Sequence, residues 1–313
     1  MYFGRKFEFD LIQCHDLPTL EAAVILSKEK KVKLIYDSHE LYPEQHVFSK
    51  HKKVFYRKFE ERLIQYCDLV FTVNQSIAEK MAEYYPIKTP VTLINALDAP
   101  KEFDANRDYD LFREHLNIPI SKKILLYQGG FSINRQIESL VESMLCVKNK
   151  DVVLVMMGSG DINMILQNKA KELGLLNKRV YFHEAVPQAN LIYYTASADM
   201  GIIPYPHIDL NSYYCTPNKL FEFIQAQLPI IGNDSPELRR FIEKPGFGMV
   251  YLMDSALSIA SSIDSAFASL DTASWKSNLK EKSPLFSWHE ISQIYLDAIQ
   301  PFIHQNLKDL TLD

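Results

Sequence analysis

Short apolar runs recur along the chain, and most are followed by a segment whose apolar residues return with helical periodicity. Strands that are buried on both faces of a parallel sheet read as such continuous runs. The first third of the chain carries four of them, FDLIQC (9–14), VKLIYD (32–37), LVFTV (69–73) and VTLIN (91–95). The pattern predicts βα units and a parallel sheet of four strands.

Six more runs follow a polar connector of low glycine content at 99–123. They are ILLYQGG (124–130), VVLVMMG (152–158), RVYFHE (179–184), DMGIIPY (199–205), PIIGND (229–234) and GMVYL (248–252), and the tail from 255 onward shows helical periodicity alone. We predict an N-terminal domain at 1–112, a complete doubly wound domain at 113–285, and a C-terminal helix in 286–313 that crosses back to the N-terminal domain. The carboxyl ends of two such sheets can face one cleft, where doubly wound folds bind their ligands.

The composition narrows the class of partner. The 313-residue chain has a formal net charge of −5, and nucleic acid is not an expected partner because affinity for it rests on Lys and Arg. The cysteines have neither zinc-ligand nor CxxC spacing, so we expect no metal site and no disulfide framework, which fits a reducing cytoplasm; they are Cys14, Cys67, Cys146 and Cys215. No run reaches the roughly 18 to 20 apolar residues that span a bilayer, and the first ten residues lack a signal-peptide core. We expect a cytoplasmic protein, either free or peripheral at the inner face of the membrane.

The segment TPNKLFEFIQAQLPIIGND (216–234) carries the most specific chemistry. Thr216 or Asn218 can cap a helix that begins near Lys219, and the positive end of such a helix favours an anion. Lys219 is placed there to hold a diphosphate, and Glu222, one turn further, can accept hydrogen bonds from ribose hydroxyls. An exposed Lys219–Glu222 pair on a surface helix, worth about 0.2–0.5 kcal/mol, explains the same spacing. The residues alone leave both interpretations open.

PNKLFEFIQAQLPII (217–231) resembles the donor-binding segment of retaining GT-B glycosyltransferases of the large family four. Six further segments resemble that family in the same order: DLIQCHD, LIYDSHELYPE, CDLVFTVNQSIAEKM, ILLYQGGFSINRQIESLVESM, VVLVMMGSGD and PLFSWHEISQIYLDAI. The match runs from about residue 9 to residue 299, and the order of the motifs carries it. The resemblance implies an α/β fold of the GT-B type, with two doubly wound Rossmann-like domains facing a cleft and the N-terminal one incomplete.

The same resemblance implies a donor site in the C-terminal domain. Arg135 and Lys219 would neutralise the diphosphate of a UDP- or GDP-sugar, and Glu222 would bind the ribose. The backbone near Asn218 would donate hydrogen bonds, and the nucleobase would lie near Val186. No cofactor and no metal ion is implied beyond the nucleotide sugar.

Glycines and a histidine complete the implied site. Gly129 and Gly130 would let the backbone approach the diphosphate, although a strand-to-helix turn alone also explains them. His15, together with Arg135 and Lys219, forms the catalytic set, because its family counterpart faces the transferred sugar. A lone histidine is more often structural. Asp16, His39 and Glu40 also follow predicted strands and can line the same cleft, but the role expected of His39 and Glu40 is to hold loops.

Two departures from the family pattern matter. Tyr214, beside Thr216, stands where many relatives have a first glutamate that contacts the sugar, so we expect an altered sugar contact. Only eight residues precede Phe9, so the N-terminal half-sheet lacks units that normally cover its edge. An exposed edge invites pairing, so we expect a homodimer, a complementary chain or a truncated gene product.

We expect transfer of a sugar, with retention, to a hydroxyl of a glycan or lipid-linked glycan in polysaccharide biosynthesis. The alternative is an inactive or partner-dependent nucleotide-sugar-binding subunit, and a GT-B epimerase acting on UDP-N-acetylglucosamine ranks third. The basic stretch at 28–62 ends in a segment with apolar residues at helical spacing, which continue just beyond it: Val54, Phe55, Phe59, Leu63 and Tyr66. This pattern predicts either peripheral membrane contact or packing of the helix on its own sheet.

Overall fold

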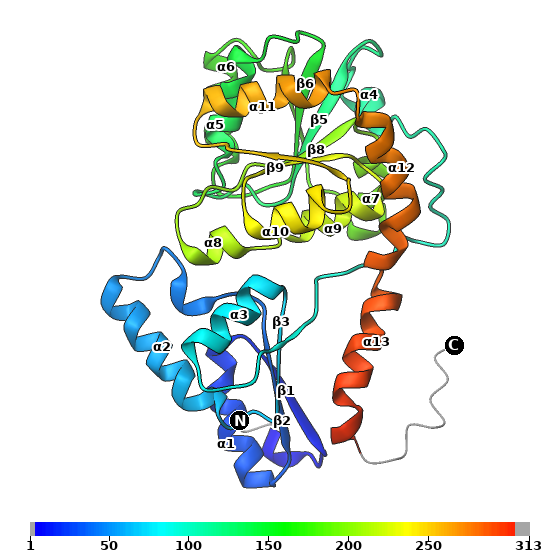
Figure 1. The fold of residues 1–313 in the computed structure, drawn as a ribbon. Coiled ribbons are helices and arrows are strands. Elements are labelled where there is room, and N and C mark those ends of the chain that lie inside the picture. The colour runs from blue at the N-terminus through cyan, green and yellow to red at the C-terminus, as the bar shows by residue number, and fades with distance from the viewer. Residues whose placement is uncertain (1–3, 304–313) are drawn as a thin grey trace. The chain divides into compact units, whose positions relative to one another are not determined.

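The computed structural model describes residues 4–303, which divide into two compact units (Figure 1). The first unit contains the chain up to Asn95, the segment Asp209–Thr216, and the residues from His289 onward. The second contains Ala96–Ile208 and Pro217–Trp288. Each unit is an α/β layer structure around its own parallel sheet.

The first unit is built on a four-stranded parallel sheet in the order β1-β2-β3-β4. The strands are β1 (Leu11–His15), β2 (Lys33–Ser38), β3 (Leu69–Thr72) and β4 (Val91–Thr92), which confirms the four predicted runs. Its helices are α1 (Leu17–Lys30), α2 (Lys50–Ile64), α3 (Gln75–Tyr84), α8 (Leu210–Tyr214) and α13 (Trp288–Ile299), with short 3₁₀ turns at Gly4–Lys6, Tyr42–Glu44 and Gln300–Phe302.

Both faces of this sheet are covered. Apolar residues of α1, α2 and α3, among them Leu20, Leu63 and Ile77, form a core with Leu34 and Tyr36 on one face. On the other face Ile35 and Phe71 pack against Ile299 and Tyr295 of α13. Residues of β2, β3 and α13, which are far apart in the sequence, therefore form one hydrophobic cluster.

The second unit contains a six-stranded parallel sheet in the order β10-β9-β8-β5-β6-β7. The strands are β5 (Lys123–Gln128), β6 (Val152–Met157), β7 (Val180–His183), β8 (Met200–Ile203), β9 (Ile230–Asn233) and β10 (Gly248–Tyr251), so all six predicted runs are confirmed. The helices are α4 (Leu111–Leu116), α5 (Ile137–Cys146), α6 (Asn163–Glu172), α7 (Gln188–Thr195), α9 (Asn218–Gln225), α10 (Pro236–Leu238), α11 (Ala256–Ala268) and α12 (Thr272–Lys282), with a π-helical turn at Arg239–Glu243 and a 3₁₀ turn at Ser283–Phe286.

Helices cover both faces of the six-stranded sheet, with α5, α6 and α11 on one side and α7, α9 and α10 on the other (Figure 1). Every residue of β6 is buried, as the continuous apolar run VVLVMM requires. The chain runs from β5 outward to β7 and then returns to β8 beside β5. This reversal creates a switch point at the carboxyl ends of β5 and β8.

The units divide the chain differently from the expected boundaries at 112 and 285. The connector after Asn95 belongs to the second unit, because Phe103 and Tyr109 stack on each other and both pack on Tyr193 of α7. The segment Asp209–Thr216 belongs to the first. Helical structure in the tail is confirmed as far as residue 302, and residues 304–313 lie outside the described part.

Candidate functional site

The switch point of the second unit begins at the end of β5 with Gly129 and Gly130. Gly129 has φ +118°, a conformation that glycine adopts most readily, and a Cβ there would lie 3.4 Å from the Lys219 side chain. At Gly130 a Cβ would meet nothing within 4 Å. The backbone at Gly130 therefore faces open space where a ligand can approach.

A second glycine-containing turn, at 158–160, packs against this loop. Phe131 N donates to Ser159 O at 2.8 Å, and a Cβ at Gly158 would lie only 1.9 Å from Gly129 O. The Gly158-Ser159-Gly160 turn after β6 thus packs directly against the loop after β5. The predicted Gly-x-Gly motif has a structural role here, which is to set the position of Gly129 and Gly130.

Two cations gather on aromatic rings beside the loop. Lys219 is only 5% exposed, and its Nζ lies 3.6 Å from the ring centroid of Tyr127 and 5.0 Å from that of Tyr205. Arg135 Cζ lies 4.4 Å from the same Tyr205 ring. Aromatic faces attract cations, so the rings hold both positive charges close together at the switch point. The interpretation of Lys219 as part of an exposed surface pair is wrong, because its side chain is buried.

Helix α9 begins at Asn218, close to the predicted start, but its N-terminus is not capped by the residues that were expected to cap it. Pro217 occupies the N-cap position and has no side-chain acceptor, whereas Thr216 Oγ1 accepts a hydrogen bond from Asn74 Nδ2 at 3.3 Å. The expectation that Thr216 or Asn218 caps the helix is therefore wrong. The first backbone N–H groups of α9 carry no capping side chain from these residues and keep their capacity to bind an anion.

Glu222 lies one turn into α9 and joins a short polar chain. Gln128 Nε2 donates to Glu222 Oε2 at 2.5 Å, and Thr195 Oγ1 donates to Gln128 Oε1 at 2.8 Å. Burial raises the pKa of the Glu222 carboxyl above its usual value, while the bond from Gln128 and the charge of Lys219 lower it. Glu222 also lines a cavity of about 250 Å³ together with Gln188 of α7 and neighbouring residues.

The remaining predicted donor residues separate into the two units. Val186 is half-buried in the loop after β7, at the same end of the six-stranded sheet. Tyr214 and Thr216 belong to the first unit, where Asn74 Nδ2 donates to Tyr214 O at 2.7 Å. The structure therefore brings Gly129, Gly130, Arg135, Lys219 and Glu222 to one edge of one sheet, and it gives Tyr214 and Thr216 contacts with Asn74.

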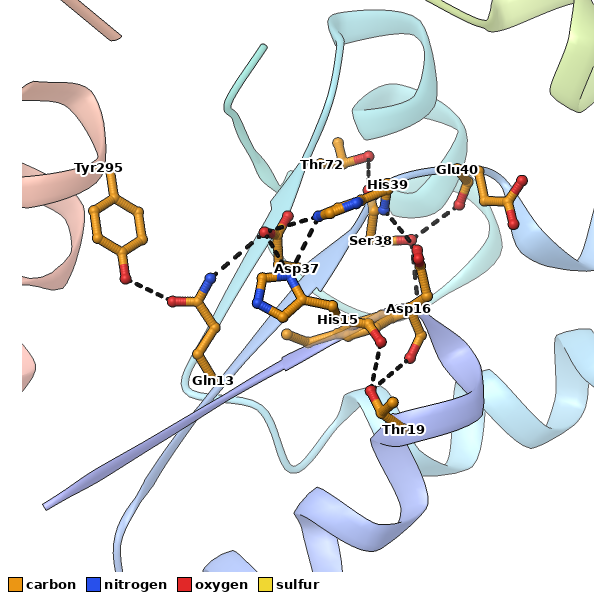
Figure 2. Close-up of polar contacts among 11 residues, drawn as sticks. Gln13, His15, Asp16, Thr19, Asp37, Ser38, His39, Glu40, Thr72 and Tyr295 are labelled. Atoms are coloured by element: carbon orange, nitrogen blue, oxygen red, sulfur yellow. Dashed lines mark hydrogen bonds and ion pairs between the residues drawn. The ribbon is translucent and has the colours of Figure 1, made fainter. Parts of the chain in front are cut away.

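His15 belongs to a compact polar cluster in the first unit (Figure 2). His15 Nδ1 lies 3.2 Å from Asp37 Oδ2 and 3.3 Å from His39 Nε2, and His39 Nε2 lies 3.1 Å from the same Asp37 oxygen. The hydrogen bond to Asp37 raises the pKa of His39 above its usual value. His15 is therefore part of a His–Asp–His cluster.

The loops around the cluster are tied together by backbone contacts. Asp16 has φ +58°, its N–H donates to Asp37 O, and its Oδ1 accepts from His39 N at 2.9 Å. Glu40 accepts from Asn211 Nδ2 at 3.1 Å, and burial raises the pKa of its carboxyl. These contacts hold the ends of β1 and β2 in place, which agrees with a loop-holding role for Asp16 and Glu40.

Sequence reasoning missed several residues of both sites. Tyr127 and Gln128 stand inside the run ILLYQGG and read as strand core, and Tyr205 ends the run DMGIIPY. Asp37 was visible only as the end of its strand, yet His15 and Asp37 are direct partners in the β1–β2 register. The sequence signal for this cluster was the polar ending of two adjacent parallel strands.

Solved structures of other proteins identify the fold. The chain superposes on a sucrose-phosphate synthase from Thermosynechococcus elongatus with a TM-score of 0.76 and 19% identity, over 96% of this chain and 76% of that one. HepE from Anabaena in complex with UDP gives a TM-score of 0.77 and 16% identity, over 96% of this chain and 81% of that one. The fold is that of the GT-B glycosyltransferases, with two Rossmann-like domains, as predicted.

Family models give the narrower assignment. The model described as Glycosyltransferase Family 4 matches residues 3–96, and that described as Glycosyl transferases group 1 matches residues 122–268. Together they cover more than three quarters of the chain, and the chain belongs to the GT-B glycosyltransferases of the family-4 type. An uncharacterized glycosyltransferase of Methanocaldococcus jannaschii is 25% identical over 205 residues, which is 63% of this chain and 52% of the relative. The chain thus aligns with about half the length of that relative.

Proposed function

We propose that the chain is a retaining, metal-independent glycosyltransferase that moves a sugar from a UDP- or GDP-sugar to a hydroxyl of a glycan or lipid-linked glycan. The observation that carries the proposal is the pair of cations, Arg135 and Lys219, held on Tyr205 beside the open backbone of Gly130. A diphosphate carries the complementary charge. UDP, which HepE binds in its solved structure, is the first candidate for the nucleotide.

The chemistry follows from where charge develops. As the bond from the anomeric carbon to the donor phosphate breaks, the diphosphate leaves with the bonding electrons and becomes more negative. Arg135, Lys219 and the N-terminal N–H groups of α9 stabilise that charge, and such preorganised groups contribute most when they are held before the reaction. Glu222 accepts hydrogen bonds from the ribose, Val186 contacts the base, and His15 orients the transferred sugar. Tyr214 in place of a glutamate alters the contact with the sugar.

Thermal denaturation with nucleotides tests the donor site. We expect millimolar UDP or GDP to raise the melting temperature of the wild-type chain, because a ligand that binds only the folded state stabilises it. Lys219→Met preserves packing on Tyr127 but removes the charge, and we expect it to weaken nucleotide binding about ten- to a hundredfold. Lys171→Ala, which changes an exposed lysine of α6, is the matched control. Unchanged affinity in Lys219→Met would remove that residue from its role.

The runner-up function is a partner-dependent nucleotide-sugar-binding subunit. The observation in its favour is β1, which lies at the edge of its sheet and shares a cavity of about 300 Å³ with α1. A second copy or a complementary chain would add strands there. Such a subunit binds nucleotide normally but shows neither transfer nor donor hydrolysis alone, whereas the active enzyme hydrolyses donor slowly and gives a product whose anomeric configuration, read by NMR, matches the donor. Sedimentation velocity over a concentration series reports self-association.

We further propose peripheral contact with the cytoplasmic leaflet through α2. Leu63 faces the core, but Val54 and Phe55 are 53% and 61% exposed, beside the exposed Lys52 and Lys58. Part of the predicted apolar stripe thus packs on its own sheet and part is available to lipid. None of the helices in residues 4–303 has the length and apolar content needed to cross a bilayer.

Co-sedimentation with liposomes tests this contact. Each Lys or Arg near an anionic surface contributes about 1 kcal/mol, so we expect binding to anionic vesicles at low salt that weakens as salt screens it. The double substitution Val54→Ser/Phe55→Ser should reduce binding, and Leu270→Ser, at an exposed leucine of the second unit, should not. Equal, negligible binding to neutral and anionic vesicles would refute the contact.

A further inference from the structure

The His15–Asp37–His39 cluster has the spacing of a metal site. One atom from each side chain, His15 Nδ1, Asp37 Oδ2 and His39 Nε2, forms a triangle with sides of 3.2, 3.1 and 3.3 Å. These three residues form the one group of potential metal ligands found among the described residues. Ligands bound at about 2.0–2.1 Å around a tetrahedral ion lie about 3.3 Å from one another. The spacing of the three observed atoms therefore fits an ion bound just outside their plane.

Strand pairing and one backbone hydrogen bond bring the three ligand atoms together. His15 and Asp37 are register partners at the carboxyl ends of β1 and β2. His39 follows two residues after Asp37, and its backbone N–H is fixed by Asp16 Oδ1 at 2.9 Å. The Asp37 side chain is 10% exposed, whereas those of His15 and His39 are 54% and 44% exposed. The carboxylate is thus anchored inside the fold and the imidazoles reach outward.

An outer layer of polar contacts orients the carboxylate. Gln13 Nε2 lies 3.5 Å from Asp37 Oδ2, and Tyr295 Oη donates to Gln13 Oε1 at 2.6 Å (Figure 2). Thr72 Oγ1 donates to Ser38 O at 2.8 Å beside it. Residues that hydrogen-bond to the metal ligands are typical of functional metal sites, where they set the orientation of those ligands.

We propose that His15, Asp37 and His39 bind a divalent transition-metal ion of the zinc class. Two imidazole nitrogens and one carboxylate oxygen suit Zn²⁺ and exclude Mg²⁺ and Ca²⁺ as preferred ions, since those take oxygen ligands. The protein supplies three ligands and the exposed side of the cluster leaves the fourth position to water. The ligands of this site belong to the first unit and the cations Arg135 and Lys219 to the second. The test of the metal site does not depend on transferase activity.

Metal binding to the full chain, stripped of metal by a chelator, tests the inference directly. Calorimetric titration with Zn²⁺ should give one ion per chain, and Co²⁺ should give the visible absorption of a tetrahedral site without the thiolate charge-transfer band. The titration is made in a Cys146→Ser background, because Cys146 is exposed. His39→Ala should weaken the affinity more than about a hundredfold, and Gln13→Ala, which acts through Asp37, about tenfold.

The matched control is His46→Ala. His46 Nδ1 lies 3.3 Å from Asp209 Oδ2, so it offers a histidine–carboxylate pair of similar exposure without the third ligand. Its substitution should leave Zn²⁺ affinity unchanged. Circular dichroism establishes that each variant is folded. The proposal is overturned if the wild-type chain takes up no Zn²⁺ or Co²⁺, or if His39→Ala binds Zn²⁺ as tightly as the wild type and the His46→Ala control do.

One consequence rests on the proposed function. An ion on His15 Nδ1 withdraws that histidine from the sugar, so Zn²⁺ should inhibit transfer reversibly, with recovery on chelation. Failure of this inhibition with Zn²⁺ still bound would argue against the role of His15 in transfer and would leave the metal site intact. Failure of binding would remove the site and leave the transferase proposal standing.

Discussion

One buried titratable side chain, Glu60, makes the stability of the first unit depend on pH. Its side chain is 1% exposed in α2, and its two oxygens accept hydrogen bonds from Tyr36 and Tyr85, both at 2.7 Å. Burial raises the pKa of Glu60 to about 7, although the two tyrosine hydroxyls lower it. The carboxyl is therefore protonated in the folded chain at a pH where the unfolded chain has released the proton.

The sign of the resulting pH dependence follows. Between the ordinary pKa of 4.5 and about 7 the folded state holds the extra proton, so the free energy of unfolding falls as pH rises through this window. The full effect corresponds to about 3 kcal/mol. Glu60→Gln cannot ionise, so its stability relative to wild type should increase by about that amount between pH values of roughly 4.5 and 8. Urea unfolding at both pH values measures it.

Glu61→Gln, at the exposed neighbour in the same helix, is the control for that experiment. It removes one carboxyl from the chain without removing the buried one. A stability difference between Glu60→Gln and wild type that is the same at both pH values would show that folding does not raise the pKa of Glu60.

At the scale of elements, the turn after β6 fixes the geometry of the loop after β5. Gly158 has φ +153°, and a Cβ there would collide with Gly129 O at 1.9 Å. Gly158→Ala should therefore lower the free energy of unfolding by more than about 2 kcal/mol and weaken nucleotide binding, because Gly129 must move. Chemical denaturation and nucleotide titration measure the two effects.

Comparison with Gly174→Ala separates the effect of backbone strain from the effect of a collision of the new Cβ. Gly174 also has positive φ, +67°, but a Cβ there would meet nothing within 4 Å. We expect a cost of about 1 kcal/mol and unchanged nucleotide affinity. Equal effects of the two substitutions would show that the contact between the turns is unimportant.

The helices and strands could be predicted from the sequence, but the side-chain contacts between different elements could not. All ten apolar runs form strands. In a strand that is buried on both faces, as β6 is, only apolar residues fit, which makes the run easy to recognise. The capping of α9 was mispredicted because Thr216 bonds to Asn74, a residue of another element. The expectation of no metal site was based on cysteine spacing along the chain, and such spacing does not show that His15 and Asp37 meet through strand pairing.

At the scale of the whole chain, α13 lies far from the first unit in sequence but completes its core. The Tyr295 ring packs against that of Phe71 in a tilted arrangement with ring centroids 5.4 Å apart, and its hydroxyl donates a hydrogen bond to Gln13. We expect Tyr295→Ala to destabilise the first unit by about 2 to 3 kcal/mol and to leave the second unchanged. Tyr295→Phe keeps the ring and should cost about 1 kcal/mol.

Scanning calorimetry with limited proteolysis distinguishes the units. Ile294→Ala changes the adjacent residue of α13, which is 43% exposed, and should have a smaller effect on the first unit. A loss of stability spread equally over both units after Tyr295→Ala would show that they unfold as one. A C-terminal helix was expected to cross back to the N-terminal domain, and α13 packs in the first unit against Ile35 and Phe71.

The edge position of β1 also determines how its backbone exchanges hydrogen with solvent. Asp16 N donates to Asp37 O, so by alternation the amides of Ile12 and Cys14 face β2 and those of Gln13 and His15 face away from it. In a monomer with the edge open, the latter two amides should exchange deuterium rapidly even though their neighbours are protected. If another chain adds a strand, their protection should rise with protein concentration, residue by residue, and this odd-and-even pattern distinguishes a strand laid along β1 from association through any other surface.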